Sequence, residues 1–179
     1  MELLEGILTR RTVRKFTGEK LSHQQIEKLI YHASHAPSWA NSQCVRFVAL
    51  TEDAAREAMA RQACTGNNVN NVLGAAVVFV LCGVKGKSGY LGGKVASPDP
   101  AGWMMFDCGG AAEALCLAAH GMGLGTVQIG HFDQQKAGEL IGLPEDMQVV
   151  ELIACGYPAQ TPEKPKRLEV DELLRYNYF

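Results

Sequence analysis

Four cations and one hydroxyl lie within six consecutive residues near the start of the chain, from Arg10 to Lys15. The rest of the sequence has little charge bias, because the formal net charge is only −2. Guanidinium groups bind phosphate oxygens through paired hydrogen bonds, and a neighbouring hydroxyl can donate one more. The cluster therefore predicts a local anion site, although a solvated turn after a short helix would contain the same residues. A second basic cluster, Lys164–Arg167, lies near the C-terminus.

A second stretch with chemical potential is the polar loop from Ala36 to Gln43, which lies between a helix stopped by Pro37 and an apolar strand. Its Ser38, Asn41 and Gln43 would supply neutral donors and acceptors suited to a polar heterocycle. Proline, serine and asparagine are also ordinary turn residues, so the loop alone does not define a site.

Two further segments have the same two interpretations. The asparagines at 67, 68, 70 and 71 suit either a helix cap and turn or the edge of a ligand. The glycines of the segment 121–126 would let the backbone lie flat against a planar ligand, or would pack a helix tightly against a strand. Their spacing is not that of a dinucleotide-binding fingerprint.

Composition narrows the class of protein. The 179 residues are 47% hydrophobic and 20% charged, as expected of one globular domain. Six scattered cysteines without a C-x-x-C pair indicate buried, reduced thiols, and the five histidines lack metal-ligand spacing. The pI of about 6.2 and the absence of aromatic residues among the basic ones argue against nucleic-acid binding. With neither a secretory signal nor an apolar run long enough for a bilayer, we expect a cytoplasmic protein with no membrane partner.

Hydrophobic periodicity predicts helices at 2–9, 23–35, 53–64, 103–121 and 133–141. It predicts strands at 47–50, 73–82, 127–132 and 147–155. Ser22 and Gln25 form a capping-box pattern at the start of the second helix. The segment 83–102 is read as a loop or lid. The predicted fold is α+β, an α/β sandwich with a mixed sheet of four or five strands flanked by helices, in a single domain spanning 1–179.

The helix at 103–121 and the C-terminal tail predict a second subunit. The helix is apolar around most of its circumference, and a domain this small needs a partner chain to bury it. The tail, 160–179, ends in apolar and aromatic residues that we expect to dock on that partner.

Taken in order, these stretches resemble the nitroreductase family of FMN-dependent oxidoreductases. The resemblance covers nearly the whole chain and rests on several short motifs in the right order. They are the R-R-T-x-R cluster at Arg10–Arg14, A-P-S-x-x-N-x-Q at Ala36–Gln43, Arg46-Phe47-Val48, the asparagine-rich turn, G-L-G-T at Gly123–Thr126 with Ile129-Gly130, and K-P-K-R at Lys164–Arg167.

The resemblance implies FMN at the interface of a homodimer. Arg10, Thr12 and Arg14 would hold the phosphate, Arg11 would lie near the phosphate or the ring edge, and Lys164, Lys166 or Arg167 would complete the cationic site. From the other subunit, Ser38, Trp39 and Asn41 would cover the ring, with Pro37 and Gln43 nearby. Asn68 or Asn71 would bond the pyrimidine edge, and the backbone of Gly130 and His131, after Gln128 and Ile129, would lie beside N5.

The implied activity is ping-pong hydride transfer, in which NADH or NADPH reduces FMN and a small-molecule acceptor such as a nitroaromatic or a quinone reoxidises it. Little acid–base machinery is then needed, which agrees with the absence of an obvious catalytic triad. The alternative is a non-catalytic flavin protein with a storage or sensing role. Departures from the family pattern lie close to the expected flavin: Ala40 stands where glycine is common, Cys44-Val45 where many relatives have Pro-Trp, and His131 where a small residue is frequent.

Overall fold

The computed structural model describes residues 2–179. The elements follow in chain order as α1 (Leu3–Thr9), α2 (His23–Ala33), the 3₁₀ turn η1 (Trp39–Asn41), β1 (Val45–Leu50), α3 (Asp53–Ala63), α4 (Asn68–Gly74), β2 (Val77–Val84), β3 (Tyr90–Leu91), β4 (Lys94–Val95), α5 (Pro100–Gly121), β5 (Gly125–Ile129), α6 (Gln134–Leu140), β6 (Met147–Gly156) and α7 (Val170–Leu173).

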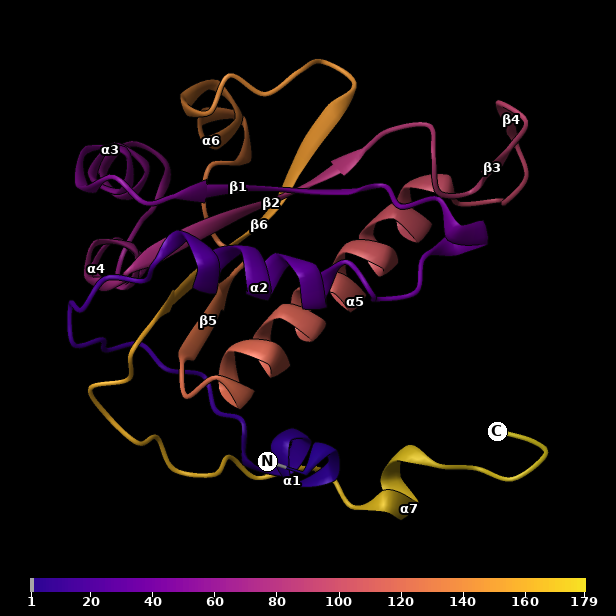
Figure 1. The fold of residues 1–179 in the computed structure, drawn as a ribbon. Coiled ribbons are helices and arrows are strands. Elements are labelled where there is room, and N and C mark those ends of the chain that lie inside the picture. The colour runs from indigo at the N-terminus through magenta and orange to yellow at the C-terminus, as the bar shows by residue number, and fades with distance from the viewer. Residues whose placement is uncertain (1) are drawn as a thin grey trace.

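One four-stranded sheet, in the order β1-β2-β6-β5, forms the middle layer (Figure 1). Helices α2 and α5 cover one face, and α3, α4 and α6 cover the other. The predicted α/β sandwich is confirmed, with one correction. All three strand pairings are antiparallel, so the sheet is not mixed, and the parallel contact is an isolated bridge between Thr12 and Thr126. Strand direction was missed because a buried apolar strand has the same composition in either orientation.

Strand β2 is the centre of the core, and every one of its residues is buried. Successive strand side chains point to opposite faces of a sheet. Phe79 and Leu81 thus pack with α2 and α5, whereas Val78 and Val80 pack with α3, α4 and α6. The unbroken apolar run in the sequence is explained by burial on both faces, as predicted.

The helices around this core begin at recognisable caps. Ser22 and Gln25 make the predicted capping box, in which the Gln25 N–H donates to Ser22 Oγ over 3.2 Å and Gln25 Oε1 accepts from the Ser22 N–H over 2.9 Å. Helix α5 starts three residues earlier than predicted, with Pro100 in its first turn and Asp99 accepting from the Gly102 N–H. Both caps satisfy backbone donors that a helix start leaves unpaired.

Two segments differ from the sequence-based expectation. Asn68, Asn70 and Asn71 belong to α4 rather than to a turn, because Val72 and the Asn71 side chain are buried against the core and outweigh the weak helix propensity of asparagine. The segment 83–102 begins in β2, ends in α5 and contains the small β3–β4 hairpin between them. Its suggested role as a lid remains a prediction.

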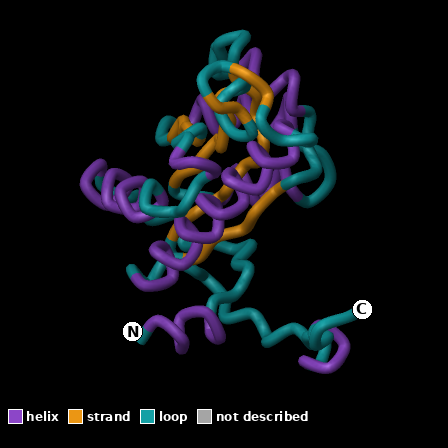
Figure 2. The backbone as a smooth tube through the Cα atoms, turned by 90° about the vertical axis from the view of Figure 1, so that its right-hand side faces the viewer, coloured by secondary structure: helices purple, strands orange, loops and turns teal. Residues whose placement is uncertain are grey.

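Both ends of the chain extend away from the sandwich. Figure 2 shows α1 and the C-terminal tail beyond the body of the molecule. The apolar face predicted for α1 exists, but Leu4 is 74% exposed and Leu8 is 64% exposed. Within the described residues, no helix is sufficiently long and apolar to traverse a membrane. All six cysteines are buried and free, which confirms the prediction of reduced thiols.

Candidate functional site

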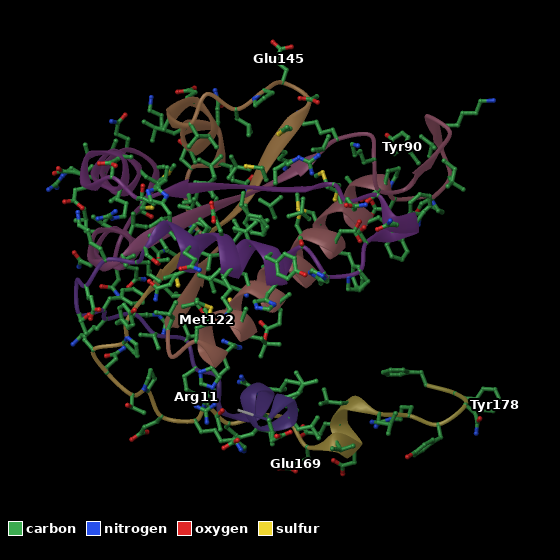
Figure 3. All side chains as sticks on the ribbon, viewed as in Figure 1. Arg11, Tyr90, Met122, Glu145, Glu169 and Tyr178 are labelled. Atoms are coloured by element: carbon green, nitrogen blue, oxygen red, sulfur yellow. The ribbon has the colours of Figure 1, made fainter. Side chains whose placement is uncertain are left out.

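The two basic clusters meet in space. Eight residues from the N-terminal segment and the tail line a pocket of about 230 Å³: Arg10, Arg11, Thr12, Arg14, Pro162, Glu163, Pro165 and Arg167. The tail therefore passes the N-terminal cluster, and Figure 3 shows Arg11 at the junction between α1 and the body. Four guanidinium groups at one pocket outnumber the single lining carboxylate, Glu163, and this donor set suits a phosphate dianion.

Strand β5 holds the N-terminal cluster in place. The Val13 N–H donates to the Thr126 carbonyl over 2.8 Å, and Thr12 forms a bridge with Thr126. The Val13 side chain is buried and lies over Gly125, where an added Cβ would come within 2.6 Å of the valine Cβ. Glycine at this position lets the cationic segment lie flat along the sheet edge.

Internal contacts orient two of the arginines. Arg10 Nε donates to Glu113 Oε1 of α5 over 3.1 Å, and Arg11 Nη1 donates to the carbonyls of Leu8 and Arg10 over 2.9 and 2.8 Å. A guanidinium has five N–H donors, so each arginine keeps donors for a ligand. The contact with the Glu113 carboxylate was not anticipated from the sequence, because Glu113 lies in the C-terminal half of α5 and only the fold brings it to Arg10.

Two titratable groups that interact with Glu113 or with the arginines have shifted pKa values. Burial, and secondarily the charge of Glu113, raises the pKa of Glu151 to about 7. Burial and then the charges of Arg10 and Arg11 lower the pKa of His120, whose Nε2 lies 2.9 Å from Thr9 Oγ1. Both shifts favour the neutral form relative to the ordinary side chain, as burial does for a carboxyl and for an imidazole.

Of the three tail cations expected at the anion site, only Arg167 lines the pocket. Lys164 and Lys166 are exposed and lie outside its lining.

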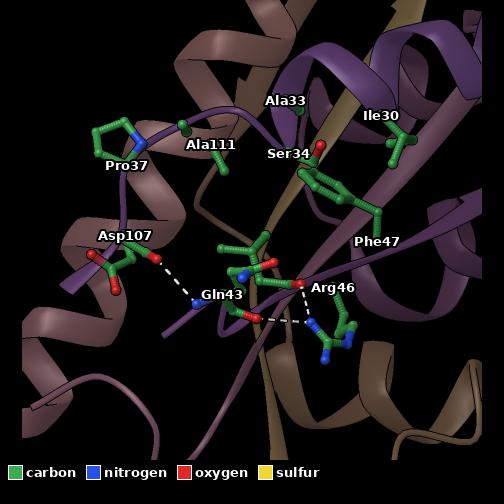
Figure 4. Close-up of a pocket in the computed structure, with 12 residues that line it drawn as sticks. Ile30, Ala33, Ser34, Pro37, Gln43, Arg46, Phe47, Asp107 and Ala111 are labelled. Atoms are coloured by element: carbon green, nitrogen blue, oxygen red, sulfur yellow. Dashed lines mark hydrogen bonds between the residues drawn. The ribbon is translucent and has the colours of Figure 1, made fainter. Parts of the chain in front are cut away.

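A separate pocket of about 330 Å³ lies at the polar loop (Figure 4). Its lining comes from α2, the loop, β1 and α5: Ile30, Ala33, Ser34, Ala36, Pro37, Ser38, Gln43, Val45, Arg46, Phe47, Asp107 and Ala111. Arg46 Nη1 donates to the carbonyls of Gln43 and Val45, so this cation braces the loop. Trp39 and Asn41 belong to η1 and are outside this lining.

Beneath the loop, four groups donate to the buried carboxylate of Asp107. They are the Trp39 N–H, the Ser42 hydroxyl, the Ser88 hydroxyl and the Cys44 thiol. A hydrogen bond from Cys108 lowers the pKa of Cys44, whereas burial and the Asp107 charge raise it. In the sequence, Asp107 is one of the few charged residues of the predicted apolar helix at 103–121. That rarity was the available signal, because an unpaired carboxylate seldom lies inside a core.

The remaining predicted residues lie near the end of β5. Asn71 Nδ2 donates to Asn68 Oδ1 over 3.1 Å, and Asn68 Nδ2 donates to the His131 carbonyl over 3.1 Å. The two asparagines thus form a relay that fixes the backbone after Gly130. Gln128 Nε2 donates to Cys116 Sγ over 3.4 Å. Ile129 is buried in the core, whereas Gly130 is exposed.

The fold thus brings the two basic clusters together but keeps the polar loop in a different pocket of the same chain. That the loop serves a site on another subunit remains a prediction.

Comparison with known proteins gives the family. The model of the Nitroreductase family matches residues 7–71 and 60–157. The chain is 31% identical over 185 residues to the NADPH-flavin oxidoreductase of Vibrio harveyi, covering 98% of this chain and 74% of that protein. It is 26% identical over 183 residues to the oxygen-insensitive NADPH nitroreductase of Salmonella typhimurium, covering 100% of this chain and 74% of that protein. The solved NADPH:FMN oxidoreductase of Vibrio harveyi, complexed with NAD⁺, superposes with a TM-score of 0.85 at 29% identity, covering 99% of this chain and 77% of that one.

The chain therefore belongs to the nitroreductase family, as the order of its motifs predicted.

Proposed function

We propose that the protein is an FMN-dependent NAD(P)H oxidoreductase that reduces nitroaromatics, quinones or similar electrophiles by a ping-pong mechanism. The observation that carries this proposal is the cationic pocket, where Arg10, Arg11, Arg14 and Arg167 converge from opposite ends of the chain. Family membership and the names of the relatives support the same cofactor and electron donor.

The cationic pocket fits the phosphate of FMN. Arg14 and Arg167 offer guanidinium donors, Thr12 offers a hydroxyl, and Arg10 is already oriented by Glu113. Charge-assisted hydrogen bonds to a dianion would anchor the cofactor, with Lys164 and Lys166 adding a diffuse positive field. When bound, FMN supplies the hydride chemistry, accepting from a nicotinamide and passing electrons to an acceptor.

The chain's own contribution near the ring is orientation. The relay from Asn71 through Asn68 to the His131 carbonyl holds the segment after β5 in one conformation. The exposed backbone at Gly130 is then available to donate to a flavin ring atom. Ser38, Trp39, Asn41 and the flanking Pro37 and Gln43 would cover the ring from the second subunit.

A homodimer completes this site. Apolar side chains are exposed on three elements that a partner would cover: Leu4 on α1, Phe106 on α5, and the tail, where Tyr178 lies far from the sheet (Figure 3). Phe106 is 71% exposed although other residues of α5 are buried against the sheet. Large apolar side chains left exposed on several elements are what a protein–protein contact would cover.

The test is a visible absorption spectrum of the purified protein, before and after anaerobic addition of NADH or NADPH, followed by addition of a quinone or nitroaromatic. We expect a yellow protein that bleaches within seconds and recovers its colour when the acceptor is added. A yellow protein that stays oxidised would instead assign a storage or sensing role. A colourless protein that takes up no added FMN would overturn the proposal. Sedimentation of the same sample tests the dimer.

A further inference from the structure

The backbone of the polar loop adopts an unusual conformation. Ala40 has φ 46° and ψ 33°, and Asn41 and Gln43 have φ 52° and 48°. None of the three is glycine, and the left-handed region is unfavourable for residues that carry a Cβ. Asparagine tolerates this region better than most residues, but alanine and glutamine do not. Such strain persists only where the surrounding structure imposes it.

The loop's own hydrogen bonds do not attach it to the rest of the fold. The Asn41 N–H donates to the Ser38 carbonyl over 2.9 Å, and the Gln43 N–H donates to Ser38 Oγ over 3.0 Å. Both bonds lie within the loop, so they shape the turn without fixing its position on the sandwich.

Asp107 supplies that attachment. The Trp39 N–H lies 3.0 and 3.1 Å from its two carboxylate oxygens, and Ser42 Oγ lies 3.3 Å from Oδ2. Ser88 Oγ, from the turn after β2, is 2.5 Å from Oδ2 and 2.8 Å from Ser42 Oγ. One carboxylate thus ties the loop to α5 and to a third segment of the chain.

The carboxylate is built into this position. Asp107 is only 2% exposed, and none of the ion pairs found within residues 2–179 includes it. Burial of a carboxylate without a cation is unfavourable unless several donors surround it, and here the loop supplies them. An apolar residue would fill the same space with less penalty, so the arrangement points to a task beyond packing.

We propose that Asp107 is a positioning residue that holds the segment 38–43 in its observed conformation, with Ala40, Asn41 and Gln43 in the left-handed region, so that Ser38, Trp39 and Asn41 reach the flavin of the partner subunit preorganised. The inference rests on the proposed function. The inference also explains why alanine is possible at position 40, where glycine is common in the family. Glycine would adopt the observed φ without strain, whereas in this chain the hydrogen bonds to Asp107 offset the strain at Ala40.

The experiment is a double-mutant cycle on the full-length protein, comparing wild type, Asp107→Asn, Ala40→Gly and the double variant. FMN affinity is measured by titrating the apoprotein, and the visible flavin spectrum of each complex is recorded. Asparagine keeps one acceptor oxygen for the Trp39 N–H but replaces the other oxygen with an NH2 group, which cannot accept from the serine hydroxyls or the Cys44 thiol. Asp107→Asn should therefore weaken FMN binding by about tenfold or more. Ala40→Gly alone should change the affinity by less than about twofold.

The decisive variant is Asp107→Asn with Ala40→Gly. If Asp107 acts through loop strain, glycine at position 40 restores most of the lost affinity and the wild-type flavin spectrum. If the two changes simply add, or if Asp107→Asn leaves both affinity and spectrum unchanged, the inference is overturned while the flavin function stands. A wild-type protein that binds no FMN overturns the proposed function itself, and the inference with it.

Two further variants provide a control and a substitute for Asp107→Asn. Asp99→Asn removes a carboxylate from the same helix at its exposed N-cap and should leave FMN affinity unchanged. Ser88→Ala removes one donor to Asp107 that lies outside the loop. This variant replaces Asp107→Asn in the cycle if Asp107→Asn does not fold. Its smaller loss of affinity should likewise be restored by Ala40→Gly; failure of that rescue would count against the inference.

Discussion

The cationic pocket and the polar loop are built on different physical principles. The pocket derives its properties from side-chain charge: Arg10, Arg11 and Arg14 are nearly consecutive, and Arg167 joins them. The loop derives its properties from backbone conformation, with Ala40 in a strained geometry and a buried carboxylate beneath it.

Because the pocket relies on charge and the loop on backbone conformation, the two regions depend on the rest of the fold in different ways. Arginine side chains are long, and several of them can share a phosphate, so the pocket tolerates small displacements. The loop holds a strained backbone whose main attachment to α5 is one buried carboxylate, so we expect it to be more sensitive to a change at that carboxylate. We expect changes in the pocket to act on phosphate anchoring, and changes around the loop to act on how the ring is covered.

The largest effect is expected for Arg10→Ala combined with Arg14→Ala. Removing two charge-assisted contacts should weaken FMN binding by about 100-fold or more. Binding of riboflavin, which lacks the phosphate, should change little. Flavin fluorescence titrations of both ligands measure the difference, with Lys15→Ala as a control for charge in the same segment. A double variant that keeps stoichiometric FMN would show that the phosphate lies elsewhere.

A smaller effect is expected for Gly125→Ala, which tests how β5 positions the pocket. The new Cβ would collide with the Val13 side chain, and relief would require the cationic segment to move. Overpacking of this kind costs about 1 to 3 kcal/mol of unfolding free energy. Urea unfolding and FMN titration should both register the change. Gly121→Ala is the matched control, because a Cβ added at Gly121 would meet no atom of another part of the fold within 4 Å. Equal behaviour of the two variants would refute the role assigned to this contact.

The smallest effect concerns Glu151, whose pKa is raised to about 7 by burial and by Glu113. The folded protein binds the proton more tightly than the unfolded chain, so this group's contribution to stability is complete below about pH 4.5 and is lost as the pH rises toward 7.

Glu151→Gln should remove that loss. Because the side chain is half-buried, we expect a gain of about 1 to 2 kcal/mol at pH 8 and little change at pH 4.5. Chemical denaturation across this pH range measures it. The exposed Glu145, at the turn before β6 in Figure 3, provides the control variant Glu145→Gln. A pH-independent difference between Glu151→Gln and wild type would contradict the assignment.

Local chemistry made several features predictable. The Ser22–Gln25 capping box, the doubly buried β2 and the basic clusters depend on short patterns whose physical meaning does not change with context. Helix α4 was missed because its asparagines favour turns locally, and only burial of Val72 and Asn71 against the core makes the segment helical.

The sequence by itself determined the composition of the anion site, the apolar strand at the centre of the sheet, and the motif order that identifies the family. Only the tertiary structure decided that Glu113 orients Arg10, that the sheet is antiparallel, and that Asp107 anchors the loop at Trp39. The physical reason is the sequence distance over which each interaction acts. Charge, capping and hydrophobic pattern act over a few residues, whereas a hydrogen bond between α5 and the loop depends on where the packed core places two distant segments.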